Sequence, residues 1–352
     1  MTKFGKRFGI GAIIPAAIVA VSVVAATTVF AAEVNKIAIL VPEEGTDFGW
    51  NQQGVDAARA VAEKYGLEFV SAEGLGYGDI RPTLRELAEE GVDLMIAHAS
   101  GYNTAAPEIA IETGVAVAVV DTPDAIKKGL IADYTLSGRE GAYLAGVMAA
   151  EMSRSGTLGI VVSGEPPSWN SQSAAFAMGA KAENSAIKLI YAVIGPAAYG
   201  DAAGGRRVTA SVISAGADII FGQGNGSSFG MIQAVETVKA VDGGKVMFID
   251  VIGDKSSLDK GHLLSSVIWD MIPVYSAMIE DLRNDTFGTR GYGIGLSDNS
   301  VRLLKTPYIP ADVWSDLMTM RDEIINGSLT VEEISDAQEV RELMSSVDIG
   351  EG

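Results

Sequence analysis

The chain contains no cysteine and only two histidines, and acidic residues outnumber basic ones. The lack of cysteine excludes disulfides, thiolate metal sites, a cysteine nucleophile and a lipid-modified N-terminal cysteine. The two histidines, His98 and His262, lack the spacing of a helical zinc motif, so no metal site is expected. With 26 Lys and Arg against 45 Asp and Glu, the formal net charge is −19. Such a surface repels nucleic acid and anionic lipid, so neither is an expected partner.

Signatures of nucleotide binding and of catalysis are also missing. The glycine-rich stretch GQGNGSS at 222–228 has no GK[ST] sequence and no GxGxxG followed by an acidic ribose partner. No set of nucleophile, base and orienting residue can be recognised, and no stretch has a dense cluster of carboxylates. We therefore expect no catalytic residues and no cofactor, and we do not expect an enzyme.

Strand and helix patterns alternate along most of the 352 residues. This length suggests two domains of ordinary size. Short apolar runs at 36–41, 67–72, 92–100 and 115–123 predict strands, with helical patterns between them and no hairpin signal. The first run, KIAILV, is apolar without alternation, as is typical of a strand covered on both faces. The order predicts an α/β fold with parallel sheets.

The pattern starts again at Ser137. The run 139–154 predicts a helix with Gly141 and Gly146 at positions of close packing, and a second series of strands and helices follows. We predict one lobe from 34–136 plus 255–290 and a second lobe from 137–254 plus 291–340. The strand 262–270 is assigned to the first lobe, so the chain is expected to cross back near residue 254. Residues 291–306 predict a strand, turn and strand, 311–325 an amphipathic helix containing a core Trp314, and 341–352 an acidic tail.

The N-terminal segment resembles a targeting signal. Basic residues at 3, 6 and 7 precede the apolar run 10–26, and small residues at 29–33 offer a cleavage site after Ala31. We expect residues 1–31 to be a signal peptide and the remainder to be a soluble periplasmic protein rather than a lipoprotein. The alternative is an uncleaved membrane anchor, because the run approaches the length that spans a bilayer.

The loop DFGWNQQG at 47–54 combines two aromatic rings, a carboxylate and an amide directly after the first strand. Ligands of open α/β sheets bind beyond the carboxyl ends of the strands, so this loop is a candidate binding element. The alternative is a helix cap, in which Asp47 accepts hydrogen bonds from backbone N–H groups.

All candidate binding residues follow the carboxyl ends of predicted strands. They are Asp47, Phe48, Trp50, Asn51, His98, Asp121, Trp169, Phe176, Asn225, Phe229, Asp250, Trp269 and Asp270. Aromatic rings at these places suit a flat heterocycle, and carboxylates suit the hydroxyls of a diol. Alternatives are open for several of them: His98 can be a wall residue, Trp169 a loop anchor, and Asp250 and Asp254 turn caps.

Three stretches together resemble one known family. They are the strand, loop and helix around DFGWNQQG, GREGAYLAGVMAAEMSRSGTLGIVV at 138–162, and AGADIIFGQGNGSSFGMIQA at 215–234. They resemble the basic membrane protein family of ABC transporter substrate-binding proteins, which includes purine nucleoside receptors. The resemblance covers 36–290. It implies a type I periplasmic binding protein with two Rossmann-like lobes joined by a multi-crossing hinge.

The resemblance also implies roles for particular residues. In the family's nucleoside receptors aromatic rings hold the base and an aspartate holds the ribose. Asp47, Phe48 and Asn51 match the first family motif, and Phe229 and Asp250 match later ones. A basic residue that many relatives carry is replaced here by Ile268, Trp269 and Asp270. This change favours a neutral or cationic ligand over an anionic one, and two inserted residues leave open whether Asp250 or Asp254 faces the cleft.

The leading hypothesis is therefore a solute-binding protein of an ABC importer that closes around a purine nucleoside or similar heterocycle. Its partners would be a permease and an ATPase, and we expect a monomer. One alternative is a sugar or polyol ligand on the same fold, since a sugar also stacks on aromatic rings. Another is a sensor anchored in the membrane by the uncleaved segment 10–26.

Overall fold

The structure is a computed structural model that describes residues 1–3, 5 and 33–346. The predicted signal peptide, except for its first few residues, and the last six residues of the predicted acidic tail lie outside this range. The chain divides into a unit of residues 1–31 and a unit of residues 32–352, and the description below concerns the second unit. None of the helices in the described residues is both long enough and apolar enough to cross a membrane.

Two sheets with mainly parallel strands form the framework of this unit. The first has the order β11, β5, β4, β3, β1, β2, and the second has the order β12, β10, β9, β8, β6, β7. The first comprises β1 (Lys36–Leu40), β2 (Glu68–Ala72), β3 (Leu94–Ala97), β4 (Ala116–Val120), β5 (Ile131–Thr135) and β11 (Tyr292–Gly293). The second comprises β6 (Thr157–Val162), β7 (Lys188–Val193), β8 (Ile219–Gln223), β9 (Met247–Ile252), β10 (Leu263–Trp269) and β12 (Val301–Leu303). The predicted α/β class with parallel sheets is confirmed.

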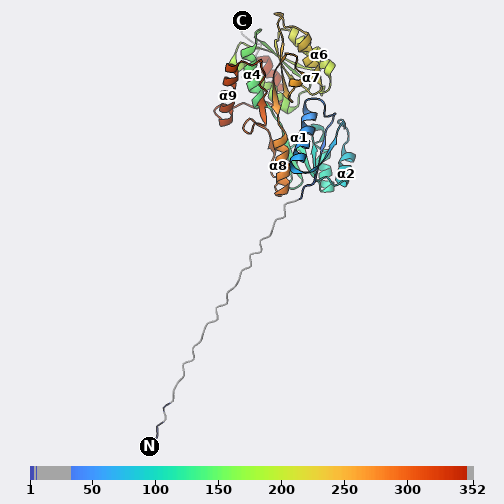
Figure 1. Cartoon of the computed structure of the whole chain (residues 1–352), viewed down its shortest axis with the longest axis vertical. Helices are drawn as coiled ribbons and strands as arrows, with labels where there is room; N and C mark the ends of the chain where they lie inside the picture. The colour runs from blue at the N-terminus through green and yellow to red at the C-terminus, as the bar shows by residue number, and fades with distance from the viewer. Residues whose placement is uncertain (4, 6–32, 347–352) are drawn as a thin grey trace. The chain divides into compact units, whose positions relative to one another are not determined.

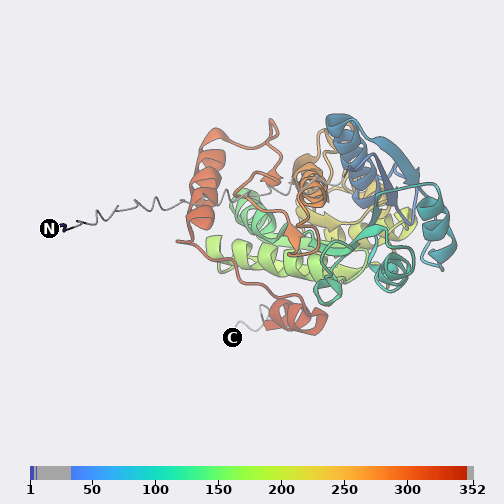
Figure 2. The same ribbon diagram turned by 90° about the horizontal axis from the view of Figure 1, so that it is seen from below.

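Helices connect the strands and cover the sheets (Figures 1 and 2). With the first sheet lie α1 (Trp50–Tyr65), α2 (Arg81–Glu89), α3 (Ala105–Thr113) and α8 (Ile272–Arg283). With the second sheet lie α4 (Arg139–Met152), α5 (Pro167–Glu183), α6 (Ala202–Ser214), α7 (Ser227–Thr237), α9 (Ala311–Asn326) and α10 (Ala337–Ser346). Short 3₁₀ helices are η1 (Ser100–Tyr102), η2 (Pro123–Ala125) and η3 (Ser256–Leu258). Each central strand is buried along most of its length, as expected for a sheet covered on both faces.

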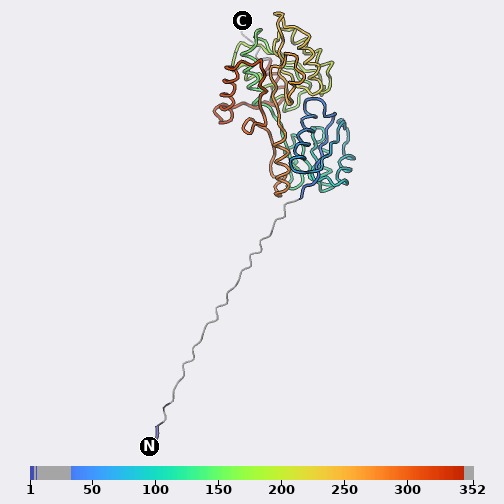
Figure 3. The backbone as a smooth tube through the Cα atoms, in the orientation of Figure 1, coloured from blue at the N-terminus to red at the C-terminus, as the bar shows by residue number. Residues whose placement is uncertain are grey.

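The predicted crossing of the chain before the strand 262–270 is wrong. β10 lies in the second sheet, parallel to β9 on one side and antiparallel to β12 on the other. A connection containing only η3 joins β9 to β10, and the sequence pattern did not reveal that the edge of β9 was free to accept another strand. The chain crosses after Trp269 instead: α8 packs against α1, and β11 pairs with β5 (Figure 3).

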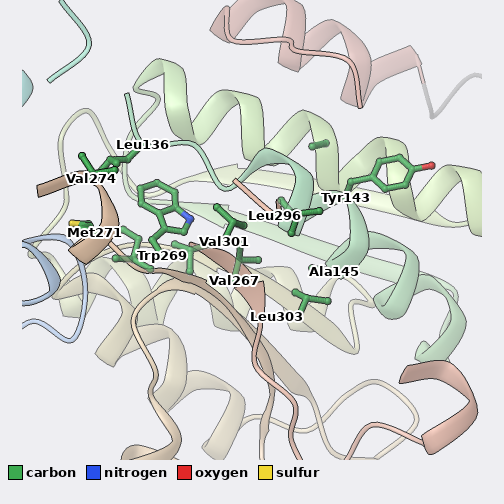
Figure 4. Close-up of a cluster of buried hydrophobic side chains, with 14 of the residues drawn as sticks. Leu136, Tyr143, Ala145, Val267, Trp269, Met271, Val274, Leu296, Val301 and Leu303 are labelled. Carbon is green, nitrogen blue, oxygen red and sulfur yellow. The ribbon is translucent and has the colours of Figure 1, made fainter. Parts of the chain in front are cut away.

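Two further details differ from the sequence-based expectation. β5 was not predicted, yet it pairs with β4 and carries the buried Tyr134. Trp269, at the end of β10, is buried beside Leu136, Met271 and Val274, so the crossing from β10 to α8 forms part of the core (Figure 4).

The expected close packing at Gly146 is present between α4 and α5. A Cβ atom at Gly146 would lie 2.0 Å from the carbonyl oxygen of Phe176, and one at Gly179 would lie 2.1 Å from the carbonyl oxygen of Tyr143. Each helix therefore places a glycine against the backbone of the other. We call the parts of the chain built on the first and the second sheet the two halves. Helix α4 leads from the first half into the second, and this contact packs it closely against α5.

We predict that Gly146→Ala lowers the free energy of unfolding by about 2–3 kcal/mol, because the helices must separate to admit the methyl group. Urea denaturation monitored by circular dichroism measures the change. Gly78→Ala is the control, since a Cβ there meets nothing within 4 Å. A Gly146→Ala protein as stable as the Gly78→Ala protein would show that the two helices pack less rigidly than described.

Candidate functional site

A cavity of about 230 Å³ lies beyond the carboxyl ends of strands from both sheets. Loops of the first sheet contribute Trp50, Tyr77, Ala99, Ser100, Asn103, Val120 and Asp121, and loops of the second sheet contribute Pro166, Pro167, Ser168, Trp169, Tyr199 and Asn225. A more open groove of about 1010 Å³ runs along α6 and α7. We take the smaller cavity as the candidate site, because ligands of open α/β sheets bind at the strand ends.

Four of the predicted residues line this cavity: Trp50, Asp121, Trp169 and Asn225. The side-chain oxygen of Asn225 lies 3.3 Å from the backbone nitrogen of Trp50, which donates to it. Asn225 follows β8 of the second sheet and Trp50 begins α1 of the first. This hydrogen bond therefore joins the two halves at the wall of the cavity.

Tyr77 and Tyr199 also line the cavity and were not predicted. Tyr77 follows β2 and Tyr199 follows β7, each in a glycine-containing loop. Their ring centroids are 6.5 Å apart, so they meet across the cavity from the two halves. The rule that found the other residues, an aromatic residue after a parallel strand, identifies both when it is applied to every strand.

Trp50 is held in place by His98. The two rings are stacked with centroids 3.9 Å apart and an interplanar angle of 8°. The indole Nε1 of Trp50 donates to the carbonyl oxygen of His98 at 2.8 Å, and Nε2 of His98 lies 3.1 Å from the carbonyl oxygen of Trp50. His98 thus supports one face of the indole and leaves Trp50 to line the cavity.

His98 itself is fully buried and does not line the cavity. It is a structural residue behind the cavity, which agrees with the alternative to a ligand contact. Its Nδ1 lies 2.7 Å from the hydroxyl of Tyr134 and 3.0 Å from the hydroxyl of Tyr275. Burial lowers the pKa of the His98 imidazole to about 3, against the opposing effect of the bond to the Trp50 carbonyl. The neutral ring donates from Nε2 to Trp50 and accepts at Nδ1 from a tyrosine.

Asp47 caps α1, as the second interpretation of the loop predicted. Its carboxylate accepts from the backbone N–H groups of Gly49, Asn51 and Gln52, at 2.9, 3.1 and 3.0 Å, and from the side-chain amide of Asn51 at 2.8 Å. Asp47 and Asn51 are both buried and absent from the cavity wall. Their interaction fixes the shape of the loop that presents Trp50.

Phe48 and Phe229 meet edge to face, with centroids 6.1 Å apart, beside the cavity rather than in its wall. Phe48 adopts a left-handed backbone conformation with φ 51°, and Phe229 is exposed along the open groove. A Cβ at Gly253 would lie 2.1 Å from the carbonyl oxygen of Phe48. These contacts bring the first loop of one half against α7 and the β9 loop of the other.

Several predicted residues lie elsewhere. Phe176 is 0% exposed and stacks on Phe221 in the core, which corrects its assignment to the site. Asp270 accepts from the backbone nitrogen of Ile272 at the start of α8, and the buried Trp269 reaches only the edge of Trp50. Neither lines the cavity.

Asp250 forms a buried ion pair with Lys255. The Lys255 ammonium lies 2.9 Å from the Asp250 carboxylate, and both side chains are at most 1% exposed. Burial raises the pKa of Asp250, and the Lys255 charge opposes this effect. Asp254 is exposed and accepts from the backbone nitrogen of Ser256, so it caps a turn. Of the two aspartates Asp250 points inward, toward a lysine of the chain itself.

Asp121 is the carboxylate in the cavity wall. It has a left-handed backbone with φ 50° directly after β4. Burial raises the pKa of its carboxyl to about 6; a hydrogen bond from Thr135 opposes the shift, and Asp133 adds to it. Asp133 in turn accepts from the backbone nitrogen of Thr122. Across the described residues, no group of three or more His, Asp and Glu side chains is arranged to hold a metal ion.

Two α/β halves with a candidate ligand cavity at the strand ends are the layout of a binding protein. A family model described as "ABC transporter substrate-binding protein PnrA-like" matches residues 34–335. The chain therefore belongs to this family of ABC transporter substrate-binding proteins, and the predicted family membership is confirmed.

Individual relatives agree with this assignment. Basic membrane protein A1 of Borrelia garinii subsp. bavariensis is 25% identical over 306 residues, 85% of this chain and 88% of the relative. A solved ABC transporter solute-binding protein from Aeropyrum pernix superposes with a TM-score of 0.74 at 16% identity, over 89% of this chain and 97% of that structure. The arabinose-binding protein AraP of Geobacillus stearothermophilus gives a TM-score of 0.57 at 14% identity, over 78% and 97%. These two structures share the fold.

We predict that Asp121→Asn stabilises the protein at neutral pH but not in acid. With a folded-state pKa near 6 against an ordinary value of 3.8, Asp121 contributes stability below about pH 4 that is lost as the pH rises to about 6. The variant should gain about 2 kcal/mol relative to the parent between pH 4 and pH 7. Urea unfolding at both pH values measures this difference, and a constant difference would contradict the raised pKa.

The opposite pH dependence is expected for His98. Its folded-state pKa lies below the ordinary 6.5, so the stability that the neutral ring contributes is complete above about pH 6.5 and declines as the pH falls. Relative to His98→Gln, the parent should lose about 2 kcal/mol between pH 7 and pH 5. In the folded parent, the NMR signals of the His98 ring should not move between these pH values, and a titration midpoint there would refute the assignment.

Proposed function

We propose that this substrate-binding protein captures a flat heterocycle, a purine nucleoside or a similar compound, and delivers it to the permease of an ABC importer. The observation that carries the proposal is the composition of the cavity. Trp50, Tyr77, Trp169 and Tyr199 supply aromatic rings, and Asp121 supplies a carboxylate among them. Rings of this kind bind a planar group by stacking, and the carboxylate accepts from its N–H or O–H groups.

Each half contributes two aromatic rings to the cavity. Trp50 and Tyr77 belong to the first sheet's loops, and Trp169 and Tyr199 to those of the second. A ligand that contacts both pairs stabilises the closed arrangement by the difference between its affinities for the closed and open forms. No bond is made or broken in this mechanism. The hydrogen bond from Trp50 to Asn225 closes one side of the cavity.

A sugar is the second candidate ligand. Asn103, Ser100 and Asn225 line the cavity with Asp121, and such groups suit the hydroxyls of a pyranose whose C–H face stacks on an aromatic ring. The fold also serves an arabinose-binding protein, as the comparison with AraP indicates. The two candidates differ in what stacks on the aromatic rings: a heterocycle in the first case and the C–H face of a sugar in the second.

We further propose that the protein acts in the periplasm as a monomer, with residues 1–31 removed, beside a permease and an ATPase. The family of substrate-binding proteins supports the extracytoplasmic location and the transporter partners. The anchored-sensor alternative requires that segment 10–26 be retained. Sequencing the N-terminus of the native protein distinguishes them, because removal of the signal leaves Ala32 as the first residue.

Isothermal titration calorimetry tests the ligand class. The protein, freed of co-purified ligand by unfolding and refolding, is titrated with adenosine, guanosine, inosine, uridine, ribose and glucose. We expect a nucleoside to bind with a Kd of about 1 μM or lower, a binding free energy of about −8 kcal/mol. Binding of sugars alone would favour the second candidate, and binding of none would refute both.

A matched pair of tyrosine variants locates the site. Tyr77→Ala removes a ring of the cavity and should weaken binding by about tenfold, the usual contribution of a stacked ring. Tyr308→Ala removes a tyrosine of the surface that does not line the cavity, and it should leave affinity unchanged. Tyr77 is 51% exposed, so its loss should not unfold the protein. Equal affinities of the two variants would place the ligand elsewhere.

A further inference from the structure

The aromatic rings of the cavity are inclined to one another rather than parallel. Trp169 and Tyr199 meet at an interplanar angle of 84° with centroids 5.3 Å apart, and Tyr77 and Tyr199 at 42° with centroids 6.5 Å apart. Trp50 adds a fourth wall whose orientation is fixed by the stack with His98. Four aromatic side chains therefore border one space from several directions, and the face of an aromatic ring is electron-rich. This is the arrangement with which proteins enclose organic cations.

The charges around the cavity have the same sign. Among the described residues that line it, Asp121 is the one with a formal charge, and no lysine or arginine is present. Asp133 lies behind Asp121, and Glu43 lies close enough to Tyr77 to raise the pKa of its phenol, in addition to the larger effect of burial. The buried Lys255 is paired with Asp250 and does not line the cavity. The cavity is therefore electronegative.

An electronegative cavity distinguishes ligands by charge. A neutral heterocycle gains stacking and hydrogen bonds, whereas a cationic one also gains attraction to the ring faces and to Asp121. Asp121 is a half-buried carboxylate with no positive side chain in the cavity wall. A ligand cation would supply the missing partner. An anionic group, such as a phosphate, meets repulsion from Asp121 and no compensating base. The affinity is therefore expected to increase in the order anion, neutral molecule, cation.

We propose that, among flat heterocycles, this cavity prefers those that carry a positive charge, such as an N-alkylated or protonated ring, held between Tyr77, Trp169 and Tyr199 and paired with Asp121. The inference rests on the proposed function, because it concerns the ligand of the same cavity. It specifies the charge of that ligand, which the shape of the cavity does not.

Matched pairs of compounds that differ mainly in charge test the inference. Adenosine is compared with 1-methyladenosine, and nicotinamide with 1-methylnicotinamide, by calorimetry on the purified protein at neutral pH. We expect the cationic member of at least one pair to bind about tenfold or more tightly than its neutral partner. Adenosine 5′-monophosphate, the anionic probe, should bind more weakly than adenosine.

Two variants assign the preference to Asp121. Asp121→Asn keeps the shape of the side chain and removes its charge, so the preference for the cation should fall to about threefold or less. Asp124→Asn removes the charge of an exposed carboxylate in the same loop that does not line the cavity, and it should leave the preference intact. Thermal unfolding of both variants confirms that they are folded.

The outcomes separate this inference from the proposed function. A preference for 1-methylnicotinamide without binding of any nucleoside would refute the purine nucleoside as ligand and support the cationic preference. Binding of adenosine at least as tight as that of 1-methyladenosine, with no preference in the second pair, would overturn the inference and leave the proposed function standing. If neither cation binds below about 1 mM, the inference is wrong. A preference that persists in Asp121→Asn would refute the role of that carboxylate.

Discussion

Parallel pairing of the strands is the constraint on which the rest of the structure depends. Because neighbouring strands run in the same direction, their carboxyl ends lie at one edge of each sheet, and the loops that follow them gather there. The cavity lies at these edges, and its walls come from loops after β1, β2, β3, β4, β6, β7 and β8. Residues more than a hundred positions apart, such as Tyr77 and Tyr199, meet for this reason.

Three of the four predicted carboxylates at strand ends serve the fold, and one lines the cavity. A loop that leaves a parallel strand usually leads into a helix, whose first N–H groups need acceptors. Asp47 and Asp270 supply such acceptors for α1 and α8, and Asp250 is neutralised by Lys255. Asp121 is different, because η2, the short helix after it, has no hydrogen bond to a capping side chain. It therefore remains in the cavity wall, where burial raises its pKa.

A rigid layer of aromatic and polar side chains stands behind one wall of the cavity. His98 links Trp50 to Tyr134 on β5 and to Tyr275 on α8, and it is neutral because it is buried. A strand that was not predicted and a helix that follows the crossing thus help to position a residue of the candidate site. The position of Trp50 in the candidate site thus depends on buried contacts with β5 and α8.

The sequence by itself determined the class of fold, most of the strands and helices, and the family, because apolar runs, helical periodicity and motif order are local properties of the chain. It also located Trp50, Asp121, Trp169 and Asn225, since each follows a strand whose direction could be inferred. Tertiary structure decided the rest. Whether Phe176 faces a cavity or Phe221, whether Asp250 is free or paired with Lys255, and whether β10 joins the first or second sheet depend on contacts between distant segments. Such contacts are decided by packing and by charge neutralisation in three dimensions, which no local pattern encodes.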